Sequence, residues 1–153
     1  MKILFVDDDK FLLDMYAFKF SKAKYEISTA EGSEKALKML RDGLEPDILL
    51  IDVVMPAMDG IDFLGAIRKE NLVNKAVVIM LTNQGLSDDI ARAKKLNVDG
   101  YIIKATTIPS EVLTEVERIY KASKKSYGIQ KRNRRIGFNA HTRRSFRYSS
   151  CRR

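Results

Sequence analysis

The chain has 153 residues, of which 45% are hydrophobic and 31% charged, which fits one globular domain with an extension. It has no apolar run near the ~20 residues of a membrane span, no signal peptide and a single cysteine, so we expect a cytoplasmic protein without a membrane partner. The net charge of +8 divides unevenly, because residues 1–117 hold 15 Lys and Arg against 20 Asp and Glu, whereas residues 118–153 hold 13 Lys and Arg and no acid.

The first part of the chain alternates predicted strands and helices. Residues 2–7 form a short apolar run that ends in three consecutive aspartates, which indicates a strand opening into an acidic loop. Apolar residues then recur at helical spacing from Phe11 to Phe18. Residues 25–29 predict a weak second strand, and residues 36–40 predict a second helix.

A third strand ends in an isolated carboxylate. Four apolar residues, Ile48 to Ile51, are typical of a strand buried on both faces of a parallel sheet. Asp52 follows them, and Asp59-Gly60 has the chemistry of a turn. Ligands bind at the carboxyl ends of strands in doubly wound folds, so Asp52 is a candidate site residue. The alternative is an aspartate that only caps the next turn.

The alternation continues to the end of the domain. Residues 63–67 predict a third helix, and residues 76–81 predict a fourth buried strand that ends at a threonine. Ser87 is a good start for a weak fourth helix, and residues 98–103 predict a fifth strand followed by a lysine. Pro109 suits the first turn of the last helix.

Five strands alternating with five helices predict a doubly wound, three-layer α/β fold with a five-stranded parallel sheet. The strand ends that carry Asp7, Asp8, Asp52, Thr82 and Lys104 would then open on one edge of that sheet. Clustered carboxylates favour a hard divalent cation such as Mg²⁺, which takes oxygen ligands. A lysine can neutralise a phosphoryl group, a threonine hydroxyl can bond one of its oxygens, and a carboxylate can be the nucleophile. The set indicates phosphoryl transfer onto an aspartate.

These residues resemble a known family. Asp7-Asp8, Asp52, Thr82, Tyr101 and Lys104, in this order and at these spacings, are similar to the response-regulator receiver domain of two-component systems. The resemblance covers about residues 2–122 and implies the flavodoxin-like, CheY-like fold.

The resemblance also implies roles. Asp52 would accept a phosphoryl group from the phosphohistidine of a histidine kinase or phosphotransfer protein. Asp8, Asp52 and the backbone carbonyl of Val54 would bind Mg²⁺ directly, and Asp7 would act largely through water. Lys104 would pair with the phosphoryl group. Such a domain is a phosphoacceptor rather than an enzyme, although it contributes to its own phosphorylation and dephosphorylation.

The output role falls on two further residues. By the same resemblance, Thr82 would bond a phosphoryl oxygen and Tyr101 would swing inward when Thr82 moves. A local change of charge would thereby bias a two-state element and change the affinity for a downstream protein, which the sequence does not name. A homodimer is also compatible with this family.

The sequence departs from the family pattern at three positions, which are Ala105, Asn83 and the third acid, Asp9. Ala105 follows Lys104 where the family usually has a proline, often after a cis bond, so a cis bond here is disfavoured. Asn83 follows Thr82 where the family often has alanine, and its larger side chain narrows the space through which the switch residues would move. Val54 and Gln84 would flank the phosphoryl group or be ordinary loop residues. We interpret Asp9 as the N-cap of the first helix.

From residue 123 the composition becomes basic and loses its apolar period, which predicts a disordered tail over residues 123–153 beyond a receiver domain of residues 1–122. The tail would bind nucleic acid or another acidic surface, link to an output domain, or be vector-encoded or out-of-frame sequence.

Two other functions compete with the stand-alone phosphoacceptor switch. In the first alternative, the chain is the receiver half of a DNA-binding response regulator whose output domain is missing. The acidic domain itself is not expected to bind nucleic acid. An aspartyl-phosphate phosphatase usually carries a second aspartate two residues after its nucleophile, and Val54 at that position argues against this enzyme.

Overall fold

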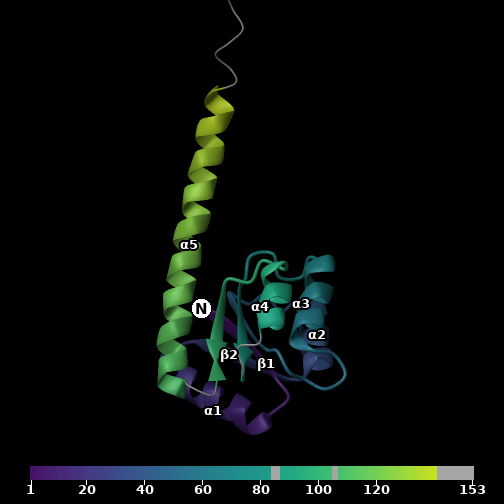
Figure 1. The fold of residues 1–153 in the computed structure, drawn as a ribbon. Helices are drawn as coiled ribbons and strands as arrows, with labels where there is room; N and C mark the ends of the chain where they lie inside the picture. Colours follow the sequence, from purple (N-terminus) through teal and green to yellow (C-terminus); the bar gives the residue numbers. More distant parts are fainter. Residues whose placement is uncertain (84–86, 105–106, 141–153) are drawn as a thin grey trace, which may run out of the picture. The chain divides into compact units, whose positions relative to one another are not determined.

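The computed structural model describes residues 1–83, 87–104 and 107–140. It contains one sheet of five parallel strands in the order β2-β1-β3-β4-β5 (Figure 1). The strands are β1 (Lys2–Asp7), β2 (Glu26–Glu31), β3 (Ile48–Asp52), β4 (Val77–Thr82) and β5 (Gly100–Ile103). The predicted parallel α/β sheet is therefore confirmed, and this strand order places β1, β3 and β4 at its centre.

Five helices follow the strands, as the sequence predicted. They are α1 (Lys10–Ser21), α2 (Ser33–Arg41), α3 (Gly60–Lys69), α4 (Ser87–Lys94) and α5 (Pro109–Ala140). Asp9 is the N-cap of α1, where its side chain accepts hydrogen bonds from the backbone N–H groups of Phe11 and Leu12. Our interpretation of Asp9 is thus confirmed. Among the described residues, no helix is both long enough and apolar enough to cross a bilayer.

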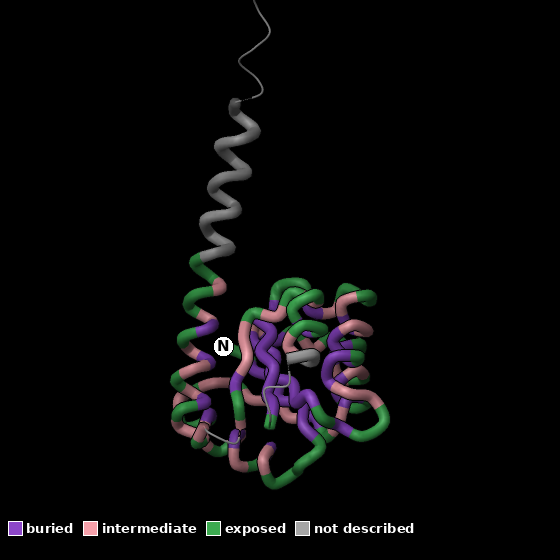
Figure 2. The backbone as a smooth tube through the Cα atoms, viewed as in Figure 1, coloured by how far each residue is buried: buried purple, intermediate pink, exposed green. Residues whose placement is uncertain are grey.

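The buried residues form two clusters, one on each face of the sheet, which gives the three-layer architecture. Figure 2 shows that burial is concentrated in the central strands. On one face, Ala36 of α2, Phe63 of α3 and Ala93 of α4 pack against the strands. On the other face, the strands contact Phe20 of α1 and Val116 of α5. Burial on both faces explains why the central strands β1, β3 and β4 are near-continuous apolar runs rather than alternating ones.

The chain divides into two compact units, residues 1–120 and residues 121–153. The first unit contains the whole sheet. In the second unit, the structure assigns residues 121–140 to α5. The disordered tail that we predicted over residues 123–153 stays a prediction. Lys, Arg and Gln are strong helix formers, and no proline follows Pro109, so a helix continues there without an apolar period. Residues 141–153 lie outside the described residues, and the domain boundary stays a prediction.

Candidate phosphoacceptor site

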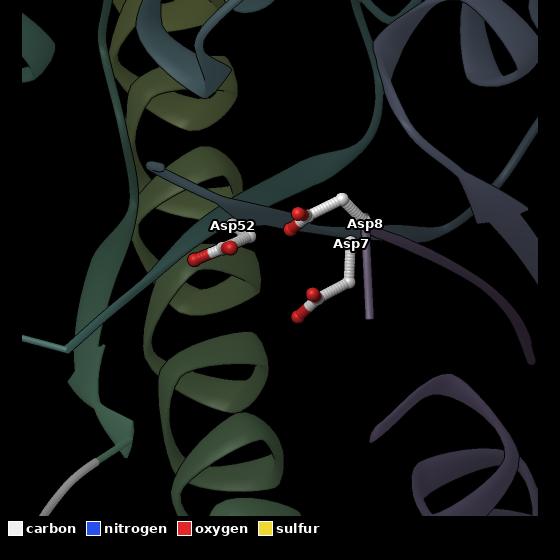
Figure 3. Close-up of side chains that lie close together, drawn as sticks. All are labelled: Asp7, Asp8 and Asp52. Carbon is white, nitrogen blue, oxygen red and sulfur yellow. The ribbon is translucent and has the colours of Figure 1, made fainter. Parts of the chain in front are cut away.

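The carboxyl ends of β1 and β3 bring three carboxylates together. Asp7 is the last residue of β1, Asp8 begins the following loop, and Asp52 is the last residue of β3. One carboxylate oxygen of each lies within 4.8 Å of the others, and the three side chains lie close together (Figure 3). Asp7 and Asp52 are buried, whereas Asp8 is exposed. Because neighbouring parallel strands end at the same edge, residues 45 positions apart in sequence share one site.

Lys104 joins this cluster from the end of β5. Its Nζ lies 2.5 Å from Oδ2 of Asp7, to which it donates a hydrogen bond, and 3.1 Å from Oδ1 of Asp52. The lysine side chain is only 7% exposed, so this ammonium group is enclosed with the two carboxylates that it neutralises. Two buried carboxylates with one buried ammonium leave one uncompensated negative charge, and Asp8 adds another at the surface.

Burial changes the protonation of both ends of this ion pair. Burial raises the pKa of Asp52 to about 6; Lys104 opposes this shift, and the negative charge of Asp7 adds to it. Burial by itself lowers the pKa of Lys104, but the hydrogen bond with Asp7 and the charge of Asp52 outweigh that effect and raise it. At neutral pH the site therefore contains an ionised but poorly solvated Asp52 beside a charged Lys104.

The oxygen of Asp52 that faces Lys104 lacks a full set of partners. Among the described residues, Oδ1 of Asp52 is buried with no aligned hydrogen bond, and the Lys104 ammonium contacts it only as an opposite charge. A buried oxygen of this kind is costly unless another group bonds it. The donor set is also entirely oxygen, which is what Mg²⁺ prefers. The residues present therefore fit a divalent cation.

Gly60 holds Asp52 at the strand end. Its N–H donates a hydrogen bond to the carbonyl oxygen of Val53 at 2.9 Å. A Cβ at position 60 would lie 2.0 Å from the carbonyl oxygen of Asp52, so only glycine allows α3 to begin this close to the strand. The side chain of Asp59 caps α3 by accepting from the N–H of Asp62. The sequence identified Asp59-Gly60 only as a turn, and the close approach is a finding of the structure.

Two of the remaining predicted residues lie at this edge and one points elsewhere. Thr82 is buried at the end of β4, one position beyond the Asp52–Leu81 pair of the sheet register. Val54 lies just beyond Asp52 and is 66% exposed. Tyr101 of β5 is half-buried, and its hydroxyl donates to the carbonyl of Ile90 in α4 at 3.2 Å instead of to the carboxylate cluster.

Several predictions concern the loops after β4 and β5. Asn83 is exposed at the start of the loop after β4. Gln84 and Ala105 lie outside the described residues, so the predicted flanking role of Gln84 and the isomer of the bond before Ala105 stay predictions.

Sequence reasoning missed two contacts around the loop between β3 and α3. Ser33 is buried at the start of α2, and its Oγ donates to the carbonyl of Met58 at 3.1 Å. Arg92 of α4 lies 3.6 Å from Asp59 and 3.3 Å from Asp62, so it ties α4 to the N-terminus of α3. A serine at a helix start is a detectable signal, but no pattern in the sequence marks the partner of a single surface arginine.

Comparison with known proteins agrees with this geometry. The response regulator receiver domain family matches residues 3–117, and the chain belongs to this family. The sequence prediction of a receiver is thereby confirmed, as is the expectation that the domain is not a classical enzyme. The family implies a phosphoacceptor role for the acidic pocket of Asp7, Asp8 and Asp52 with Lys104, and a histidine kinase as partner.

Individual relatives are similar over the same region. The chain is 30% identical to the alkaline phosphatase synthesis transcriptional regulatory protein PhoP of Bacillus subtilis strain 168, over 80% of the chain and 49% of PhoP. It is 37% identical to the transcriptional regulatory protein CpxR of Escherichia coli K12, over 67% of the chain and 42% of CpxR. The chain thus spans about half the length of these curated relatives or less.

A solved structure shares the fold. The chemotaxis protein CheY4 of Vibrio cholerae superposes with a TM-score of 0.71 at 27% identity, covering 77% of this chain and 97% of CheY4. This likeness confirms the predicted CheY-like fold.

Proposed function

We propose that the chain is the phosphoacceptor switch of a two-component system, with Asp52 as the residue that is phosphorylated. The observation that carries this proposal is the cluster of Asp7, Asp8 and Asp52 at one sheet edge, with the Lys104 ammonium in contact with two of the three. The donor would be the phosphohistidine of a cytoplasmic histidine kinase or phosphotransfer protein. The product would be an aspartyl phosphate that changes the affinity for a downstream protein.

The transfer uses Asp52 as the nucleophile. A carboxylate oxygen of Asp52 forms a bond to phosphorus while the bond from phosphorus to the imidazole nitrogen breaks, and the imidazole leaves with that electron pair. The pKa of about 6 keeps Asp52 mostly ionised at neutral pH, so no base is needed. Burial removes the water that would otherwise solvate the carboxylate, and Lys104 is placed to pair with the incoming phosphoryl oxygens.

Mg²⁺ is the cofactor that we assign to this site. Asp8, Asp52 and the backbone carbonyl of Val54 would hold the ion, and Asp7 would act largely through water. When bound, the ion neutralises charge that develops on the phosphoryl oxygens. The protein's own contribution is to hold the carboxylates in place through the strand ends and the Gly60 turn.

Thr82 and Tyr101 are the residues that we assign to the output. The Thr82 hydroxyl would bond a phosphoryl oxygen, and the movement of Thr82 would open space for the ring of Tyr101. The present hydrogen bond from Tyr101 to Ile90 supports this role, because it ties the ring to the backbone of α4. A movement of Thr82 would then change the surface that α4 and β5 present to a downstream protein.

A second candidate is the receiver half of a DNA-binding response regulator. Its support is that PhoP and CpxR, both described as transcriptional regulatory proteins, are about twice as long as the region that this chain matches. Both candidates share the chemistry at Asp52 and differ only in the output.

Phosphorylation of the Asp52→Asn variant tests the proposal. The parent protein, treated with acetyl phosphate and Mg²⁺, should gain one base-labile phosphate by intact mass, and the variant should gain none. The matched control is Asp14→Asn, which removes an exposed carboxylate from α1 and should label as the parent does. Full labelling of Asp52→Asn would refute the assignment of the phosphoacceptor.

A further inference from the structure

The hydroxyl of Ser33 does not serve the helix that it begins. Ser33 is the first residue of α2 and is buried. The N-cap position before it is occupied by Gly32, which leaves α2 without a side-chain cap. Serine favours helix starts because its oxygen can accept a hydrogen bond from a free backbone N–H there. The Oγ of Ser33 instead donates to the carbonyl oxygen of Met58, 25 positions away in the sequence, at 3.1 Å.

The acceptor belongs to the loop between β3 and α3, which follows the phosphoacceptor directly. The first half of this loop is anchored by the buried side chains of Val53 and Met55. In its exposed second half, Ala57 has φ = 67°, a left-handed conformation that is unfavourable for a residue with a Cβ and persists only where surrounding contacts hold it. The hydrogen bond from Ser33 reaches the residue after Ala57, so it is a contact of this kind.

The segment that contains Ser33 also contacts the acidic end of β1. The N–H of Gly32 donates to the carbonyl oxygen of Asp7 at 2.9 Å. Gly32 and Ser33 are adjacent, so one short segment bonds both the end of β1 and the loop after β3. The ligands that we assign to Mg²⁺ come from these two places, since Asp8 follows β1 and Val54 lies in the loop after β3.

We propose that Ser33 is a positioning residue for the cation site, whose hydroxyl holds the loop after β3 where the Val54 carbonyl and the Asp8 carboxylate bind one Mg²⁺ together. This inference rests on the proposed function, because it takes Mg²⁺ as the cofactor. Groups that orient the ligands of a metal change the affinity for it without touching it. Without the Ser33 hydroxyl, a smaller fraction of the molecules has both ligands in place, and the apparent affinity falls with that fraction.

The test is Ser33→Ala in the full chain, followed by NMR titration with Mg²⁺. Alanine removes the hydroxyl and adds no volume to the buried position. Loss of one hydrogen bond that holds the loop predicts a dissociation constant for Mg²⁺ about three- to tenfold higher than that of the parent. In the metal-free protein, amide hydrogen exchange should also be faster at Met58 and Gly60, whose N–H groups donate to carbonyls of this loop.

The matched control is Ser21→Ala, which removes another serine hydroxyl that donates to a backbone carbonyl, that of Phe18 in α1 at 3.0 Å. It should leave both the Mg²⁺ affinity and the exchange of the loop as in the parent. Equal affinity in Ser33→Ala and the parent would overturn the positioning role, and so would an equal weakening in both variants. Absence of Mg²⁺ binding by the parent would refute the cofactor assignment of the proposed function and, with it, this inference.

Discussion

The buried charge of Asp52 should make the domain less stable at neutral pH than at acidic pH, and Asp52→Asn should remove that cost. The amide has the shape of the carboxyl group but no charge to desolvate. Lys104 keeps its 2.5 Å hydrogen bond to Asp7 in the variant, so the substitution leaves no buried ammonium without a partner. We therefore expect the variant to be more stable than the parent when Asp52 is ionised.

The magnitude follows from the pKa of Asp52, which rises from its ordinary value of 3.8 to about 6. Between these values the folded protein binds a proton that the unfolded chain does not, so stability falls as pH rises through this window. About two pKa units at 1.36 kcal/mol each give a cost of up to about 3 kcal/mol above pH 6. Below pH 3.8 the carboxyl group is neutral in both states and the cost vanishes.

Urea denaturation at pH 4 and pH 7.5 without Mg²⁺ measures this difference. Asp52→Asn should exceed the parent by up to about 3 kcal/mol at pH 7.5 and by little at pH 4. Asp14→Asn, which changes an exposed carboxylate, should stay within about 0.5 kcal/mol of the parent at both. An equal gain for Asp52→Asn at both pH values, or a loss at pH 7.5, would refute the desolvation argument.

Three further results are expected. Val54→Asn should shorten the lifetime of the aspartyl phosphate about tenfold, which is ~1.4 kcal/mol of barrier, because the exposed Val54 offers no group to orient the attacking water; an unchanged decay rate would contradict this. Ala57→Gly should raise the free energy of unfolding by up to about 1 kcal/mol, because Ala57 has φ = 67°, a left-handed conformation that glycine adopts without strain. Its control, Ala66→Gly within α3, should lower the free energy of unfolding by a similar amount, because glycine is a poor helix former. Arg92→Gln should speed amide hydrogen exchange in α4, because Arg92 forms ion pairs with Asp59 and Asp62 at the start of α3. The control, Arg41→Gln, should speed exchange in α2 instead. Unchanged exchange in α4 of the Arg92 variant would show that these ion pairs do not stabilise that helix.

Most of the fold was predictable because the central strands β1, β3 and β4 are buried on both faces. The run from Ile48 to Ile51 has no polar interruption, so its burial and its end at Asp52 follow from the sequence. The edge that brings Asp7 and Asp52 together follows from parallel pairing, since β1 and β3 are neighbours in register. The contacts of Lys104 with both carboxylates required the structure, because a spacing in sequence does not fix where a long side chain ends.

Other features had no usable signal in the sequence. The part of α5 that the structure assigns to residues 123–140 has no apolar period from which a helix could be predicted, and helix propensity alone extends α5 through this basic segment. The contact of Arg92 with Asp59 and Asp62 joins residues about 30 positions apart that no periodicity connects. Secondary structure is hardest to predict in weakly patterned, polar segments, because they lack the hydrophobic period from which helices and strands are predicted.

The close approach of Gly60 to the strand has a consequence for how the gene tolerates change. In a saturation library, every amino acid other than glycine at position 60 adds a Cβ that overlaps the Asp52 backbone, so selection for folded protein should retain only glycine there. Gly65 lies in the same helix with nothing within 4 Å of its Cβ position, and alanine there favours the helix. Two glycines five residues apart should therefore show opposite fates under selection for folded protein, with position 60 invariant and position 65 drifting towards alanine.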